Sequence, residues 1–110
     1  MNSAEQQGSE RRASRRVSLV TQIRTIVGGE MLVGYSKNIS TGGIFVESEA
    51  QAEKGTELVL RFKLRSEGEI QEARAVVAYS VPGEGLGLRF VNLPDSLRQE
   101  IQAFVNEQES

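Results

Sequence analysis

The chain has 110 residues and a net charge of −2; 38% of its residues are hydrophobic and 25% charged, a composition typical of one globular domain. It contains no cysteine and no histidine, which excludes disulfide bonds, thiolate chemistry, the commonest zinc ligands and every catalytic arrangement built on a histidine base. No apolar run approaches the roughly 18 residues that cross a membrane, and residues 1–10 lack the apolar stretch of a secretory signal. We therefore expect a cytoplasmic protein without membrane insertion. We also expect no catalytic residues, no metal site and no enzymatic activity.

Alternating apolar and polar residues predict about six strands, separated by turns rich in glycine, serine and asparagine. The first strand starts at Val17, and the others are expected at 31–36, 44–46, 56–64, 70–81 and 86–90. The strand at 56–64 has the clearest alternation, and its apolar face is expected in the core: Leu58, Leu60, Phe62 and Leu64. The same alternation on the strand at 70–81 places four residues on one face: Ala73, Ala75, Val77 and Tyr79.

Near the C-terminus the apolar period changes from two to about 3.6 residues, which predicts one helix. Asp95 or Ser96 can cap its start, and the helix is expected to fade at Asn106. Its apolar stripe consists of Leu97, Ile101, Phe104 and Val105. The pattern predicts an all-β (mainly β) fold: an antiparallel barrel or sandwich with a C-terminal α-helix packed on it.

Four arginines precede the first strand: Arg11, Arg12, Arg15 and Arg16. A guanidinium group binds phosphate oxygens two at a time, and the same planar fork matches the O6 and N7 acceptors of guanine. The cluster therefore suits a phosphorylated ligand that contains guanine. A short cluster of this kind, taken alone, is more often a solvated basic tail.

A polar, glycine-containing segment follows from Asn38 to Gly43. Asn38 and Ser40 occupy alternate positions and share one face of an extended chain. Gly42 and Gly43 allow a positive φ and the close approach of backbone N–H groups to an anion. The same residue types also make ordinary tight turns, so a turn and a binding site are both compatible with this segment.

Taken together, these segments resemble the PilZ domain family, whose members carry an RxxxR motif and a [DN]xSxxG motif on a six-stranded β-barrel. Here residues 12–16 give RxxxR, and Asn38, Ser40 and Gly43 give NxSxxG. Residues 85–90, Gly-Leu-Gly-Leu-Arg-Phe, are similar to the strand that closes such domains before the C-terminal helix. The resemblance implies a six-stranded antiparallel barrel, which we place at residues 11–105. The polar composition of the flanking segments predicts a flexible tail at 1–10 and a C-terminal tail at 106–110.

The family's members are receptors for the bacterial second messenger cyclic di-GMP, so the resemblance implies a ligand and no bound cofactor. Arg12 and Arg16 would hold the guanine edges and phosphates, with Arg11 as a further candidate. Because Arg11 and Arg15 also satisfy RxxxR, the working pair stays open between the two registers.

The remaining residues carried over from the resemblance form the barrel side of the site. Asn38 and Ser40 would line its second wall, and Gly42 and Gly43 would let the nucleotide lie close to the barrel. The expected action is that of an adaptor: the arginine segment becomes ordered on the nucleotide, and the altered surface is presented to a downstream effector protein. We expect a monomer or a ligand-dependent dimer.

Two alternatives accompany this interpretation. The first is a PilZ-fold module that contacts only proteins and has no cyclic di-GMP site. The second is a small nucleic-acid-binding barrel, which the negative net charge and the 5% aromatic content disfavour.

Overall fold

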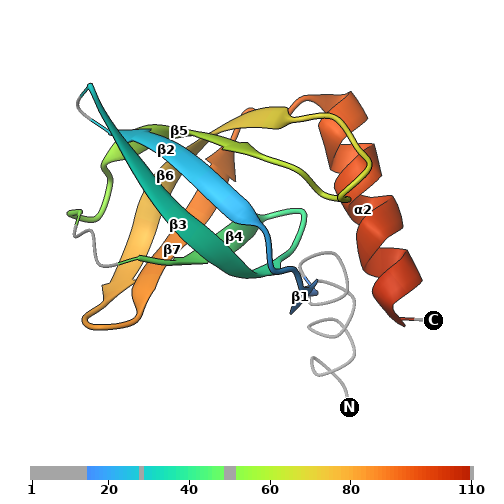
Figure 1. Ribbon diagram of the computed structural model, residues 1–110, viewed down its shortest axis with the longest axis horizontal. Helices are drawn as coiled ribbons and strands as arrows, with labels where there is room; N and C mark the ends of the chain where they lie inside the picture. The colour runs from blue at the N-terminus through green and yellow to red at the C-terminus, as the bar shows by residue number, and fades with distance from the viewer. Residues whose placement is uncertain (1–14, 28, 49–51, 110) are drawn as a thin grey trace, which may run out of the picture.

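A computed structural model describes residues 15–27, 29–48 and 52–109 of the chain. These residues form seven strands and a C-terminal helix (Figure 1), in the order β1 (Val17–Ser18), β2 (Gln22–Val27), β3 (Glu30–Ile39), β4 (Gly43–Glu47), β5 (Glu57–Phe62), β6 (Gln71–Val81), β7 (Gly85–Val91) and α2 (Asp95–Glu109). None of the helical residues in the described part makes a segment long and apolar enough to cross a membrane.

Six of the strands close into an antiparallel barrel. Neighbours are paired in the order β3–β2–β5–β6–β7–β4, and β4 pairs back with β3. The long strand β3 makes the closure possible, because its first half pairs with β2 and its second half with β4. The predicted mainly β fold, a six-stranded antiparallel barrel with one C-terminal helix, is confirmed.

One face of each barrel strand fills the interior, and α2 covers one open end of the barrel (Figure 1). The apolar face of the strand predicted at 56–64 is confirmed as part of the core. All four of its side chains are at most 7% exposed: Leu58, Leu60, Phe62 and Leu64. The apolar stripe of the helix is likewise buried: Leu97, Ile101, Phe104 and Val105. Each such side chain contributes roughly 1.5–3 kcal/mol when it is fully buried, so the helix stripe is an integral part of the core.

The first predicted strand is divided in two. β1 and β2 pair with the same edge of β3, and the regular ladder is interrupted at residues 19–21 between them. The Leu19 N–H still donates to the carbonyl of Lys37, and the Thr21 carbonyl accepts the N–H of Ser36. Ser36 explains the interruption: its buried Oγ donates to the carbonyl of Leu19 and accepts the N–H of Thr21 at 3.0 Å. The side chain of Ser36 thus replaces two backbone hydrogen-bond partners. Side chains along this stretch still alternate between the inside and the outside of the barrel, but the regular backbone hydrogen bonding to β3 is interrupted.

The helix α2 extends to Glu109, three residues beyond Asn106, where it was expected to fade. Two side-chain contacts support this last turn: Gln102 Nε2 donates to Asn106 Oδ1 at 3.0 Å, and Arg65 forms a two-pronged pair with Glu107 at 2.6 and 2.9 Å. This hydrogen-bonded pair raises the pKa of Arg65 and lowers the pKa of Glu107. The guanidinium of Arg65 also lies 5.5 Å from the centre of the Phe104 ring, which ties the β5–β6 connection to the helix.

Candidate functional site

A β-bulge in β3 directs Asn38 to the outside of the barrel. Ser36 pairs with Val46, and Asn38 pairs with the very next residue of β4, Phe45, so Lys37 is an extra residue in β3. Without the bulge, Asn38 would point inward like Ser36. With it, Asn38 is half-buried on the outer face while Ile39 is fully buried in the core.

Arg16 lies directly beside Asn38. Its Nη1 donates to Asn38 Oδ1 at 2.9 Å, and both side chains are accessible to solvent. The strand that follows explains the proximity, because Val17 of β1 pairs with Ile39 at the end of β3. The structure therefore brings together the last arginine of the basic cluster and the first residue of the NxSxxG motif.

Ser40 is 2% exposed and shapes the turn between β3 and β4. Its Oγ accepts the N–H groups of Gly42 at 3.1 Å and Gly43 at 3.2 Å, and its own N–H donates to the carbonyl of Gly43 at 2.8 Å. The hydroxyl group thus stabilises a tight turn, which is one of the two interpretations that the sequence allowed for this segment. Ser40 still lies at the edge of the cavity described below.

The two glycines of the motif occupy different environments, and neither has a positive φ. A Cβ at Gly43 would lie 2.1 Å from the carbonyl oxygen of Leu88, so glycine is needed there for β4 to approach β7. A Cβ at Gly42 would meet only the Oγ of Ser40, at 3.7 Å, and Gly42 is exposed. Gly43 is therefore needed for the packing of β4 against β7, whereas Gly42, which has no side chain, adds no protrusion to the outer surface.

An open cavity of about 260 Å³ lies on this outer face. Its lining consists of Arg16, Ser40, Gly42, Ala78, Tyr79, Gly87, Leu88 and Arg89. These lining residues include two guanidinium groups and no carboxylate. The volume is just below the range of about 300–1,000 Å³ that is usual for small-molecule pockets, so these residues form one wall of a shallow site suited to an anion.

Tyr79 and Arg89 are parts of this cavity that the sequence pattern did not single out. The prediction that Tyr79 shares one face of its strand with Ala73, Ala75 and Val77 is wrong: those three are at most 2% exposed and Tyr79 is 48% exposed. A second bulge explains the difference, because Val77 pairs with Leu88 and Tyr79 with the very next residue of β7, Gly87.

The ring of Tyr79 rests on Gly87. A Cβ at Gly87 would lie 2.2 Å from the Cζ of that ring, and the ring centre is 6.2 Å from that of Phe45. Arg89 comes from β7, where it is the register partner of Gly43 and is exposed. The available sequence signal was the glycine within the alternating strand at 85–90, since glycine inside a strand marks a close approach.

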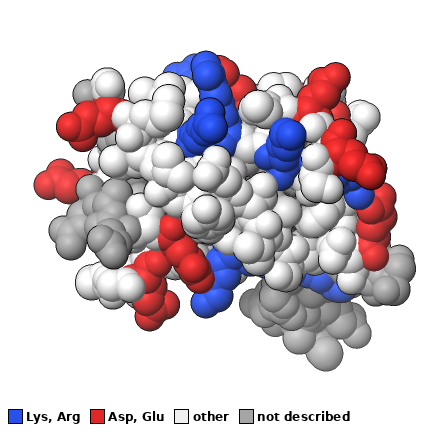
Figure 2. All heavy atoms as spheres, in the orientation of Figure 1, with Lys and Arg blue, Asp and Glu red and all other residues white. Residues whose placement is uncertain are grey.

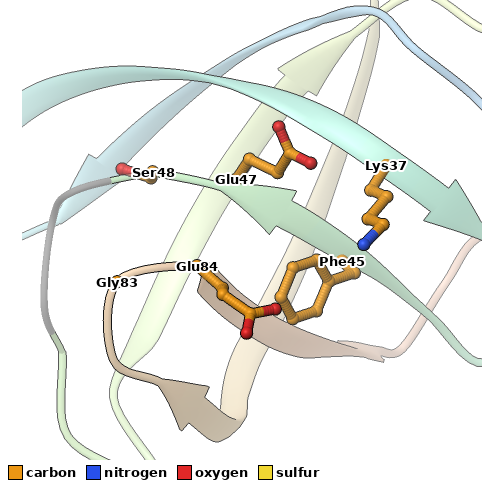
Figure 3. A pocket seen from close by; sticks show the side chains of 6 residues that line it. All are labelled: Lys37, Phe45, Glu47, Ser48, Gly83 and Glu84. Atoms are coloured by element: carbon orange, nitrogen blue, oxygen red, sulfur yellow. The ribbon is translucent and has the colours of Figure 1, made fainter.

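Two larger cavities lie elsewhere on the barrel. One, of about 440 Å³, is lined by Lys37, Phe45, Glu47, Ser48, Gly83 and Glu84, and its two carboxylates disfavour an anionic ligand (Figure 3). The other, of about 590 Å³, lies on β2 and β5 and contains three cationic side chains, Arg24, Arg61 and Lys63, together with Glu72.

Arg11 and Arg12 lie outside the described residues, as does the predicted tail at 1–10. Of each candidate RxxxR pair, the structure describes the second member, Arg15 or Arg16, and both are exposed. The choice between the two registers therefore stays a prediction.

Three solved structures with the same barrel establish the fold alone at these identities. The Bacillus subtilis inhibitor of motility MotI is 23% identical with a TM-score of 0.72; the match covers 86% of this chain and 48% of MotI, so this chain spans about half of that protein's length. The PilZ domain of YcgR from Escherichia coli with cyclic di-GMP is 17% identical with a TM-score of 0.73, covering 90% and 92% of the two chains. PlzA from Borreliella burgdorferi in complex with cyclic di-GMP is 18% identical with a TM-score of 0.59, covering 87% and 36%.

No protein of curated function matches the sequence. The sequence profile of the PilZ domain, in contrast, matches residues 10–107, which include both sequence motifs, all the barrel strands and most of α2. A match over nearly the whole chain, on the barrel described above, shows that this chain belongs to the PilZ domain family.

Proposed function

We propose that this domain is a receptor for cyclic di-GMP, which binds on the outer face at the cavity between Arg16 and Arg89. The observation that carries the proposal is the charge of this cavity. The described residues that line it supply two exposed guanidinium groups and no carboxylate, and Asn38 already holds Arg16 in place. A charge-assisted hydrogen bond contributes about 1.5–3 kcal/mol, so a ligand with two phosphate groups would bind favourably here. Two of the barrels with the same fold contain this nucleotide.

Each residue would contribute through its own chemistry. Arg16 and Arg89 would bind phosphate oxygens or the O6 and N7 atoms of guanine. Asn38 would offer its amide group, and the exposed ring of Tyr79 would stack on a base. Ser40 would act indirectly by holding the turn that keeps Gly42 flat beneath the ligand.

The arginines before Arg16 complete the proposal. Arg12 together with Arg16, or Arg11 together with Arg15, would close over the nucleotide and fix the segment on the barrel. Ordering the segment costs roughly 1–2 kcal/mol per residue, so several charge-assisted bonds are needed to offset that cost. The surface created in this way would then be recognised by a downstream protein, which makes the domain an adaptor.

Isothermal titration of the purified chain with cyclic di-GMP tests the site. We expect Arg16→Ala to weaken binding roughly 10- to 150-fold, which corresponds to the loss of about 1.5–3 kcal/mol. Arg89→Ala should have an effect of similar size. Arg98→Ala, which removes an exposed arginine from α2, is the matched control and should retain wild-type affinity.

The titration also separates the competing functions. Wild-type affinity in both Arg16→Ala and Arg89→Ala would contradict the site. Absence of heat with the wild-type chain would contradict the receptor function and support a protein-interaction module. Cyclic di-AMP is the matched control ligand, because adenine lacks the O6 acceptor that the arginine fork recognises together with N7.

A further inference from the structure

The outer face of β3 carries three exposed apolar side chains that the nucleotide site does not use. Met31 is 57%, Val33 53% and Tyr35 52% exposed, and as alternate residues of one strand they form a continuous strip. The register places two half-buried side chains beside Met31, Ile26 on β2 and then Val59 on β5. We call this set the β3 strip.

Cationic side chains lie on the β5 side of the β3 strip. Arg24 and Arg61 are direct register partners on β2 and β5, a placement that is unfavourable for like charges. Arg61 forms an ion pair with Glu72 at 3.2 Å. Neither Arg24 nor Lys63 has an ion pair with any other described residue. This side of the face therefore has an excess of positive charge.

Carboxylates lie on the opposite, β4 side of the strip. Glu47 is the register partner of Tyr35, and Glu84 lies across the adjoining cavity, with Lys37 to one side of both, near Phe45 (Figure 3). In the space-filling view from the side of β2 and β3, mainly uncharged surface lies between basic groups above the centre and acidic groups below it, with basic atoms beside those acidic groups (Figure 2). An apolar strip thus separates a basic edge from an acidic edge.

We infer that two copies of this chain associate through the β3 strip, around a two-fold axis that runs above β3 and parallel to it. Such a rotation lays each basic edge on the acidic edge of the other copy. Arg24 of one copy then lies on the β4 side of the other copy's β3, level with Val33. Glu47 pairs with Tyr35, two residues or about 7 Å farther along β3, a separation that the long Arg24 side chain can span. The apolar residues of β3 then pack against their own counterparts, as a two-fold interface requires.

The residue types favour a second copy over other occupants. Tyr, Met and Arg are enriched at the centres of protein interfaces, whereas a nucleic acid or an anionic membrane would be repelled by Glu47 and Glu84. A stable interface buries about 800 Å² on each partner, more than three side chains supply, so the charged edges have to take part. The nucleotide cavity is lined by Arg16, the turn between β3 and β4, and residues of β6 and β7, and it would remain accessible in the dimer.

Sedimentation equilibrium of the full chain without nucleotide tests this inference. The wild type should dimerise, and Val33→Lys should weaken the dimer about tenfold or more, because it places a charge at the centre of the apolar strip. Arg24→Glu and Glu47→Arg should each weaken it to a similar extent, the value expected for a close charge pair across an interface. The double variant Arg24→Glu/Glu47→Arg should recover most of the wild-type affinity, because the exchanged charges again face each other.

Arg98→Glu, a charge reversal on α2, is the matched control and should leave the association constant unchanged. Circular dichroism of every variant verifies that the barrel is folded. A wild-type chain that stays monomeric at millimolar concentration would overturn the inference. So would a dimer that tolerates Val33→Lys, or a double variant that is as weak as either single one. None of these outcomes depends on nucleotide binding, so the receptor function is tested separately.

Discussion

Replacing Gly87 with alanine should displace the aromatic wall of the nucleotide cavity. The new Cβ would lie 2.2 Å from the Cζ of Tyr79 and 2.3 Å from its Cε1, well inside van der Waals contact. The obstructing atoms belong to a side chain that is 48% exposed, so the ring can turn away while the barrel stays as it is. The substitution therefore perturbs the site through Tyr79 rather than through the backbone.

The magnitudes separate an effect on the site from an effect on the fold. Moving the ring forfeits the aromatic pair with Phe45, about 0.5–1.5 kcal/mol, while replacing glycine by alanine within a strand recovers about 0.5–1 kcal/mol. The free energy of unfolding should thus change by less than about 1 kcal/mol. Loss of base stacking costs about 1–3 kcal/mol, which predicts cyclic di-GMP affinity roughly 5- to 150-fold lower.

A double-mutant cycle measured by calorimetric titration provides the check. Tyr79→Phe keeps the ring and should retain affinity, whereas Tyr79→Ala should weaken binding as much as Gly87→Ala. The double variant should be no weaker than Tyr79→Ala alone, because both changes remove the same contact. Affinity that stays within a factor of two in Gly87→Ala would refute a stacking role for Tyr79. A fully additive double variant would refute the idea that Gly87 acts through that ring.

Two further predictions concern the scaffold. Ser36→Ala removes the partner of the Leu19 carbonyl and of the Thr21 N–H, so the free energy of unfolding measured in urea should fall by about 1–3 kcal/mol. Ser80→Ala, a control at an exposed site, should change this free energy little. Equal stability of the two variants would contradict the role of Ser36. The hydrogen bond from Arg65 lowers the pKa of Glu107. The Glu107 carboxylate therefore stabilises the folded state at every pH above the ordinary pKa range of glutamate, and this contribution is lost as the pH falls through the lowered pKa. Glu107→Gln should therefore have a slightly lower melting temperature than the wild type at neutral pH, and a difference that persists at strongly acidic pH would contradict this explanation.

Much of the fold follows from alternation in the sequence. The strand at β5 and the helix stripe at α2 were predicted correctly because each has one uninterrupted period, of two or about 3.6 residues, over its whole length. The division between β1 and β2 was not predictable in the same way. This division depends on the buried hydroxyl group of Ser36, which is fifteen residues from Thr21 in the sequence. The sequence of residues 19–21 itself does not indicate that partner.

The site was predictable in part. The resemblance to the family pointed to Asn38 and Ser40, and the structure places Arg16 beside Asn38. The sequence pattern could not assign Tyr79 to the outer face, because a bulge shifts the alternation by one residue and does not change the composition of β6 in a recognisable way. Nor could it show that Gly43 serves the contact with β7, since a glycine needed by a strand and one needed by a ligand look the same in a sequence.

The two bulges together explain why this barrel can present a binding surface on its outside. Asn38 pairs with Phe45, Phe45 with Gly87, and Gly87 with Tyr79, so these residues form one row across β3, β4, β7 and β6. The bulges lie on β3 and β6, where the row begins and ends, and each adds one residue just before the side chain concerned. With strict alternation, Asn38 would follow Ser36 and Tyr79 would follow Val77 into the core, where an amide and a phenol group would need buried partners. Each bulge thus adds a polar or aromatic side chain to the outer face at a position that alternation would have turned inward, and both bulges act on the row that adjoins Arg16.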